Sequence, residues 1–252
     1  MTNFAAPVTE WMSTPIHMVD KKTPAIEAER VLTEHSISAL GVSDGGALVG
    51  VVSRTDLLSS SSAEPGETFR VTDAPVSELM TANPIIVTDD TPLSDVAKLM
   101  LKERIHRVFV EQDGAARGVV STKDLMRAVV EKRVKTPVIE IATKGVVKVQ
   151  PTDPIALAVE RLDLSNKHGL VVADGHWPIG TFSQLDALEC RARDPRTEVE
   201  EVMNLHILCL PPDLPLHRAA HQALTLGVRR IILVDHEIVG VVSTFDFARI
   251  VR

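Results

Sequence analysis

GVVSRTDLL at 50–58, GVVSTKDLM at 118–126, GTFSQLDAL at 180–188 and GVVSTFDFA at 240–248 are four copies of one pattern. Each copy has a glycine, two more residues, a serine and, three positions later, an aspartate. A proline stands 25 or 26 residues before each glycine, at Pro24, Pro92, Pro154 and Pro215. Two landmarks that keep their spacing through four copies indicate an internal repeat of about 60 residues.

The same order of elements is predicted in every copy. Short apolar runs precede the prolines and predict first strands, at 15–19, 84–87, 146–149 and 206–210. A helix is predicted at each proline, with Thr23, Thr91 and Asp153 as caps, and Leu214 departs from that rule. Two strands follow, and the serine of the pattern then begins a second helix. Each copy therefore reads β-α-β-β-α, which gives a mixed α/β (α+β) fold.

A single copy is too small to bury a stable core, so we expect the copies to associate in pairs. The predicted modules are 1–134, with repeats at about 8–62 and 75–134, and 135–252, with repeats at about 137–193 and 198–252. The junction falls near Lys135-Thr136-Pro137. The polar stretch SSSSAEPGE at 59–67 lengthens the first interval and is predicted to be a flexible linker.

The recurring G-hydrophobic-hydrophobic-S-x-x-D resembles the CBS domain family over about residues 8–251, arranged as two tandem pairs, or Bateman modules. The resemblance implies an adenosyl ligand (AMP, ADP or ATP, with S-adenosylmethionine as an alternative) in the cleft between paired repeats. It also implies that the modules form flat discs, either within one chain or as a homodimer. No catalytic cofactor is expected.

The S-x-x-D corner suits a sugar phosphate. A serine at a helix start lies beside unpaired N–H groups, which favour phosphate, and a carboxylate one turn later can accept hydrogen bonds from two ribose hydroxyls. The resemblance gives the ribose role to Asp56, Asp124, Asp186 and Asp246, and the phosphate role to Ser53, Ser121, Ser183, Ser243, Thr122 and Thr244. The alternative is a capping box, in which serine and aspartate only close the helix end.

The start of the second strand separates the copies. Equivalent positions hold Ser38-Ala39, His106-Arg107, His168-Gly169 and Arg229-Arg230. IHRVFV from Ile105 resembles the segment that holds nucleotide phosphates in the regulatory γ subunit of AMP-activated protein kinase. We therefore expect His106, Arg107, Arg229 and Arg230 to bind phosphate, through forked guanidinium groups above all, and the corners of the second and fourth copies to be the main sites. Solubilising charge on a sheet edge is the alternative.

The third copy departs furthest from the pattern, because it has Gly169 in place of arginine and Trp177-Pro178 at a predicted strand start. It is the least favoured site. Adenine is expected against apolar strand residues, and comparable places are held by Ile16, Ile85, Val108 and Ile231. A plain core role is the alternative for each of these four.

Composition narrows the function. A formal charge of -7 and 3% aromatic residues disfavour nucleic-acid binding, and no long apolar run or export signal is found, so a cytoplasmic protein without a membrane span is expected. No catalytic motif or metal-ligand spacing is present. Together with these exclusions, the resemblance to CBS domains implies a non-catalytic, energy-sensing regulator that binds adenine nucleotide and acts on a protein partner. The alternatives are a ligand-free interaction scaffold and an S-adenosylmethionine module.

Overall fold

The computed structural model describes residues 3–60, 72–165 and 167–252. Residues 61–67 of the predicted linker lie outside the described residues. None of the helices in the described ranges is both long and apolar enough to cross a bilayer.

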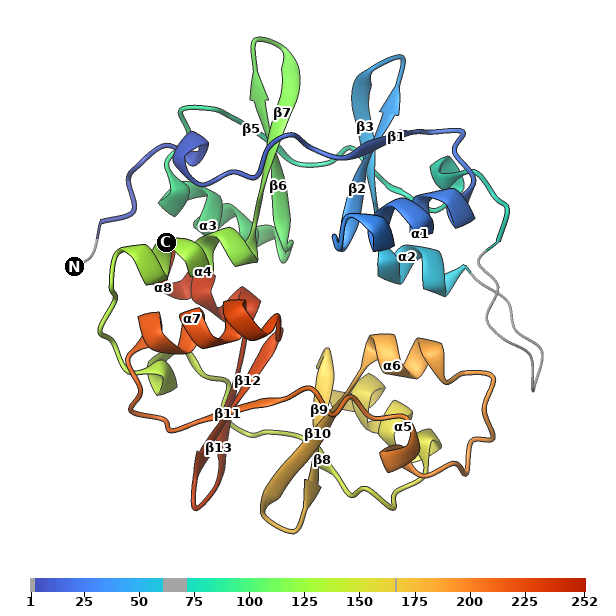
Figure 1. The fold of residues 1–252 in the computed structure, drawn as a ribbon, viewed down its shortest axis with the longest axis vertical. Coiled ribbons are helices and arrows are strands. Elements are labelled where there is room, and N and C mark those ends of the chain that lie inside the picture. The colour runs from blue at the N-terminus through green and yellow to red at the C-terminus, as the bar shows by residue number, and fades with distance from the viewer. Residues whose placement is uncertain (1–2, 61–71, 166) are drawn as a thin grey trace.

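Four β-α-β-β-α units follow one another, as the repeat predicted (Figure 1). The first consists of β1 (Met18–Asp20), α1 (Ala25–Glu34), β2 (Ala39–Asp44), β3 (Ala47–Ser53) and α2 (Arg54–Ser59). The second consists of β5 (Ile86–Thr88), α3 (Leu93–Glu103), β6 (Arg107–Gln112), β7 (Ala115–Ser121) and α4 (Thr122–Glu131), after a short β4 (Thr81–Ala82).

The second half repeats this order. Repeat 3 consists of β8 (Lys148–Val149), α5 (Ile155–Ser165), β9 (Gly169–Asp174), β10 (Trp177–Ser183) and α6 (Gln184–Glu189). Repeat 4 consists of β11 (Leu208–Leu210), α7 (Leu216–Leu226), β12 (Arg230–Asp235), β13 (Glu237–Ser243), η5 (Thr244–Phe247) and α8 (Ala248–Val251). In each sheet the strand after the first helix (β2, β6, β9 or β12) pairs in parallel with the strand before that helix and antiparallel with its hairpin partner, and β4 adds a fourth strand beside β3.

The first helices begin one residue later than predicted. Pro24, Pro92 and Pro215 themselves take the N-cap position in extended conformation, and no side chain caps these ends. Thr23 and Thr91 are therefore not the caps. Their backbone carbonyls are used by another part of the chain instead.

Each repeat is preceded by a short 3-10 turn that packs on the other repeat of its half. These turns are η1 (Val8–Glu10), η2 (Val76–Glu78), η3 (Val138–Ile141) and η4 (Val199–Glu201). The first valine of each turn donates its N–H at 2.9 Å to the segment before the first helix of that neighbouring repeat, at Thr91, Thr23, Leu214 and Asp153 respectively. All four valines are fully buried. The exchange interlocks repeat 1 with repeat 2 and repeat 3 with repeat 4.

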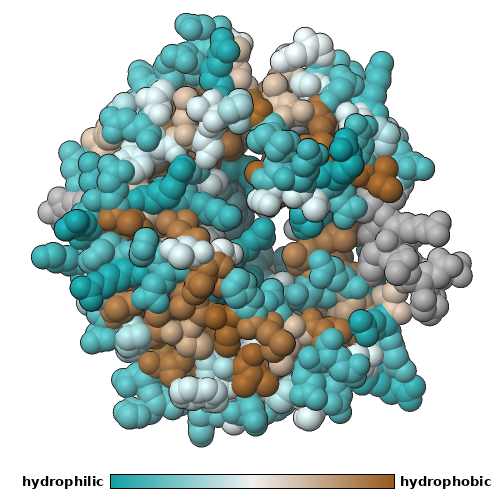
Figure 2. Space-filling model, in the orientation of Figure 1, coloured by the Kyte–Doolittle hydropathy of each residue, from teal (hydrophilic) through white to brown (hydrophobic). Residues whose placement is uncertain are grey.

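The four repeats close into a ring within one chain, with two unequal sides (Figure 1). Repeats 2 and 4 pack α4 against α7 and α3 against α8, and they share one hydrophobic core. Repeats 1 and 3 have separate cores and contact each other through α2 and α6. The space-filling view shows a hollow near the centre of this face, where the repeats approach one another (Figure 2).

Candidate functional site

All four S-x-x-D corners form capping boxes. In each, the serine N–H and Oγ both donate to aspartate Oδ2, at 2.6–2.8 Å. In this structure each serine of the pattern therefore caps the helix that follows it, as the capping-box alternative expected. The four serines are Ser53, Ser121, Ser183 and Ser243. Only one oxygen of each carboxylate is used in this way, so a ribose role depends on the other oxygen, Oδ1.

That second oxygen separates the repeats into two kinds. Oδ1 of Asp124 forms an ion pair with Arg127, and Oδ1 of Asp246 lies 3.3 Å from Arg249 Nη2. These carboxylate side chains are only 4% and 7% exposed. For Asp56 and Asp186, no described residue forms a hydrogen bond or ion pair to Oδ1. That the second and fourth corners are the main sites stays a prediction; in this structure their carboxylates are buried and both oxygens of each are engaged.

The residue three positions after the aspartate distinguishes the paired from the unpaired carboxylates, and it lies outside the S-x-x-D pattern. Copies 2 and 4 have arginine three residues after the aspartate, whereas copies 1 and 3 have Ser59 and Glu189 there. One helical turn places residues i and i+3 side by side. Arg127 and Arg249 also donate to the backbone oxygens of Trp11 (2.9 Å) and Ile141 (3.3 Å), and so fasten the leading segments that cross from repeats 1 and 3.

A cavity of about 480 Å³ joins repeat 1 to repeat 2. It brings together a carboxylate, an apolar wall and a basic wall, at Asp56, Ile85 and Arg107. The whole lining is Val51, Ser53, Asp56, Thr81, Asn83, Pro84, Ile85, Glu103, Arg104, Ile105, His106, Arg107 and Phe109. The groups predicted to act together at one corner are thus divided between two repeats, because the carboxylate of Asp56 comes from repeat 1 and the cations come from repeat 2.

Arg107 crosses to repeat 1 and donates from Nη2 to Ser38 Oγ at 3.3 Å. Burial lowers the pKa of Arg107 to about 10, with a further lowering from Arg229, while Asp56 raises it. A guanidinium with that pKa is still charged at neutral pH. No carboxylate of the described residues lies within ion-pair distance of Arg107, so its charge is available to an anionic ligand.

Arg230 takes the corresponding position in the second half. Its Nη2 donates to the backbone oxygen of His168 at 2.5 Å, and its guanidinium lies where a side chain at Gly169 would be. Burial lowers the pKa of Arg230, Asp186 raises it, and Arg229 lowers it. Gly169 makes room for an arginine from repeat 4, so the third copy's lack of a basic pair does not leave this corner without a cation nearby. The strand that begins at Trp177-Pro178 forms as β10, and its register shift between Pro178 and Gly180 has a counterpart in each of the other three hairpins.

His106 lies beside these arginines and lines the first cavity. Its ring centroid is 5.2 Å from that of Phe245 in repeat 4. Desolvation lowers the pKa of His106, and the positive charges of Arg107, His168, Arg229 and Arg230 lower it further. Burial is thus the largest cause of the lowered pKa, and the cations that gather where the repeats meet add to it.

Four of the predicted contacts have other roles. Thr122 and Thr244 are not among the residues that line the 480 Å³ cavity; their hydroxyls hydrogen-bond to each other at 3.1 Å across the interface of repeats 2 and 4. Val108 and Ile231 are buried in the shared core, as the plain-core alternative expected. Ile16 is half-buried in the segment before β1, and Ile85 is the adenine candidate that lines a cavity.

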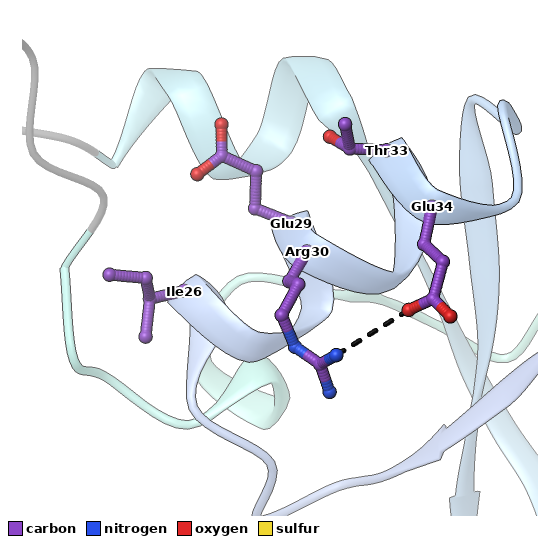
Figure 3. Close-up of a pocket in the computed structure, with 5 residues that line it drawn as sticks. All are labelled: Ile26, Glu29, Arg30, Thr33 and Glu34. Atoms are coloured by element: carbon purple, nitrogen blue, oxygen red, sulfur yellow. Dashed lines mark hydrogen bonds and ion pairs between the residues drawn. The ribbon is translucent and has the colours of Figure 1, made fainter.

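A second depression of about 410 Å³ lies on α1 and has none of these features. Its lining residues, Ile26, Glu29, Arg30, Thr33 and Glu34, all come from that one helix (Figure 3). Arg30 is already paired with Glu34 at 3.4 Å. We therefore do not regard it as the ligand site.

The repeated corners and the interlocked pairs define a protein of paired β-α-β-β-α modules. The CBS domain model matches residues 8–63, 76–131, 138–193 and 199–252, so the chain belongs to the CBS domain family.

Known proteins resemble the chain in fold and in part of its sequence. A Methanocaldococcus jannaschii protein, proposed as an archaeal homologue of the AMPK γ subunit, superposes with a TM-score of 0.79 at 16% identity, over 98% of this chain and 100% of its own. CBSX2, a chloroplastic CBS domain-containing protein of Arabidopsis thaliana, is 30% identical over 146 residues, which cover 48% of this chain and 61% of CBSX2. One solved structure of CBSX2 is a complex with AMP (28% identity, 50% of this chain, 97% of that chain, TM-score 0.44).

Proposed function

We propose that this protein is a non-catalytic regulatory sensor that binds two adenine nucleotides, one in each half of the chain. The first site uses Asp56 of repeat 1 for the ribose and Arg107 of repeat 2 for phosphate. The second uses Asp186 of repeat 3 and Arg230 of repeat 4. The modules keep the predicted division at residue 134, and an unidentified protein partner reads the arrangement of the repeats.

The observation that carries this proposal is the cavity between repeats 1 and 2, where a carboxylate with a free oxygen faces an unpaired guanidinium and an isoleucine. Ribose hydroxyls donate to a carboxylate oxygen, phosphate accepts from a guanidinium, and adenine needs an apolar wall. All three groups are present within one volume of a size that suits a nucleotide.

The charge at the centre favours nucleotides over S-adenosylmethionine. That compound carries a sulfonium cation where a nucleotide carries phosphate, and it would meet Arg107 and Arg229. Like charges at short distance in a partly desolvated site repel each other. The scaffold alternative rests on the capping boxes, which would suffice to retain serine and aspartate without any ligand.

The first prediction concerns which aspartates bind. We expect AMP to bind the purified chain with a stoichiometry of two in isothermal titration calorimetry. Asp56→Asn should remove one site, and Asp56→Asn with Asp186→Asn should remove both, because a charged acceptor for the ribose is lost. An affinity loss of about tenfold or more per site is expected, since a hydrogen bond to a charged group contributes about 1.5–3 kcal/mol.

Asp124→Asn and Asp246→Asn are the matched controls, because these residues occupy the same corner but are buried and paired. They should lower thermal stability and leave two AMP sites. Titrations with AMP, ADP, ATP and S-adenosylmethionine that show no heat and no rise in melting temperature at millimolar concentration would reject the sensor and favour the scaffold.

A further inference from the structure

Phe109 is a buried aromatic side chain that belongs to the ligand cavity and not to the core. Only 4% of it is exposed, yet it is in none of the four hydrophobic clusters of the described residues. It lines the 480 Å³ cavity between repeats 1 and 2, where the other ring is that of His106. Large apolar side chains normally pack against other apolar side chains, so a phenylalanine on the wall of an open volume is available to a ligand.

Strand alternation explains why Phe109 faces the cavity. Its neighbours Val108 and Val110 are buried in the core shared by repeats 2 and 4, whereas Arg107 and Phe109 both line the cavity. Side chains two residues apart in a strand lie on the same face, about 6.6 Å from each other along the strand. The guanidinium proposed for phosphate and the ring are thus spaced along one wall, as phosphate and base are along a nucleotide.

Two aliphatic residues adjoin this ring. The N–H of Phe109 donates to the backbone oxygen of Ile85 at 2.9 Å, so the adenine candidate Ile85 lies in the neighbouring strand segment. Val51 of β3 lines the same cavity from repeat 1. An aromatic face bordered by aliphatic side chains suits a flat heterocycle, because the ring stacks on the base and the aliphatic groups exclude water from its edges.

The equivalent residue of repeat 4, Ile232, is part of the core. It is fully buried in a cluster with Val171 and Ala173 of β9. Repeat 1 has Gly41 and Ser43 at the places of those two residues, so β2 offers Phe109 no such aliphatic partners. Side chains of the protein therefore occupy in the second half the contact that is left to a ligand in the first.

The counterpart of Ile85 follows the same division. Leu208 in β11 is 8% exposed and packs in the shared core, whereas Ile85 is half-buried and lines the cavity. The carboxylate and the guanidinium are of the same kind in both proposed sites. The two sites therefore differ in what surrounds the base.

Resting on the proposed function, we infer that the nucleobase stacks on Phe109, and that this residue makes the repeat 1–2 site selective for a nucleotide over a bare sugar phosphate. The repeat 3–4 site, with Ile232 at the equivalent position, recognises chiefly the ribose and the phosphate. The first site is then the tighter of the two for AMP. Every base has a π face, so Phe109 selects for the presence of a base and not for adenine in particular.

Two ligands measured by calorimetry at each site test this difference. AMP carries phosphate, ribose and base, whereas ribose 5-phosphate lacks the base and is measured by its displacement of AMP. Asp186→Asn leaves the repeat 1–2 site, and Asp56→Asn leaves the repeat 3–4 site. We expect the ratio of the AMP affinity to the ribose 5-phosphate affinity to be at least about tenfold larger at the first site.

Substitutions at Phe109 test whether the ring causes the difference. In the Asp186→Asn background, Phe109→Ile, which copies repeat 4, should weaken AMP about tenfold and leave the ribose 5-phosphate affinity within about twofold. Phe109→Tyr keeps the ring and should keep the AMP affinity. Ile232→Leu is the matched control at the equivalent position, because it conserves the volume of the side chain, and it should change the affinity of neither ligand at the first site.

Equal ratios at the two sites, or an unchanged AMP affinity in Phe109→Ile, would overturn the inference and leave the sensor intact. If Phe109→Ile weakens both ligands equally, the ring supports the fold of the site and does not stack on the base, which also overturns the inference. An unmodified chain that binds no nucleotide at all would reject the proposed function itself.

Discussion

Gly169 shows how one missing side chain positions a charge in the neighbouring repeat. A β-carbon at this position would lie 2.7 Å from Cζ of Arg230, closer than carbon atoms approach in proteins. The backbone there is not in the left-handed region, so glycine is needed for space and not for conformation. Repeat 1 has a small residue, Ala39, at the equivalent place beside Ser38, which Arg107 contacts.

We predict that Gly169→Ala weakens AMP binding at the repeat 3–4 site by about tenfold, because the added methyl displaces the guanidinium of Arg230, which we propose binds phosphate. The free energy of unfolding should change by less than about 1 kcal/mol, since the displaced atoms end a flexible side chain. Calorimetry and denaturant unfolding measure the two effects. If Gly169→Ala binds two AMP molecules as the unmodified chain does, Arg230 does not need this position.

At the scale of elements, the second helices of repeats 2 and 4 differ from those of repeats 1 and 3 in what their aspartate contacts. In α4, Asp124 is buried, and its two oxygens have different partners. Oδ2 accepts the capping hydrogen bond from Ser121, and Oδ1 forms an ion pair with Arg127. In α2, Asp56 keeps the cap but lacks the arginine. The same corner is therefore a structural joint in two repeats and an open acceptor in the other two.

We predict that Arg127→Ala destabilises the protein by about 1–3 kcal/mol, because it leaves a buried carboxylate oxygen without its charged partner. Lys123→Ala, on the exposed side of the same helix, should change stability by no more than about 0.5 kcal/mol. Adding Asp124→Asn to Arg127→Ala should recover part of the loss, since the unpaired charge is then removed. Equal effects of Arg127→Ala and Lys123→Ala in denaturant unfolding would contradict this role.

The order of helices and strands could be predicted because the same spacing of proline, glycine and S-x-x-D recurs in all four copies, and each of these signals acts over a short stretch of chain. The capping box could also be predicted, since it needs only residues i and i+3. Which aspartate stays open could not be derived from the corner alone. It depends on Arg127 and Arg249 and on the burial of α4 and η5 between repeats 2 and 4. For the same reason Val108 and Ile231, apolar strand residues like Ile85, turned out to be core.

At the scale of the whole molecule, the repeats on one side of the ring share a hydrophobic core, and those on the other side meet through a smaller contact. Repeats 2 and 4 bury one continuous core, whereas repeats 1 and 3 each have their own and meet only through α2 and α6 among the helix pairs with substantial contact in the described chain. Both proposed sites join an outer repeat to the shared core, through Asp56 with Arg107 and Asp186 with Arg230. Bound nucleotide would therefore act where the molecule is least constrained.

Two leucines at equivalent positions test this division of the structure. Leu57 and Leu125 each follow the aspartate of their corner and are fully buried, Leu57 in the core of repeat 1 and Leu125 in the shared core. Truncating a buried leucine to alanine costs about 2–5 kcal/mol. If the outer repeat opens on its own, that cost should appear as lower protection from hydrogen exchange only in the elements that share the affected core.

We therefore predict that Leu57→Ala lowers amide protection in β2 and β3 and leaves β6 and β12 unchanged, whereas Leu125→Ala lowers protection in β6, β7, β12 and β13 together. Hydrogen exchange followed by mass spectrometry resolves these strands. Saturating AMP should restore part of the protection lost in Leu57→Ala, because the ligand joins repeat 1 to repeat 2. If Leu57→Ala lowers protection in β12 as much as in β2, the ring unfolds as one cooperative unit and ligand cannot act through a separately mobile repeat.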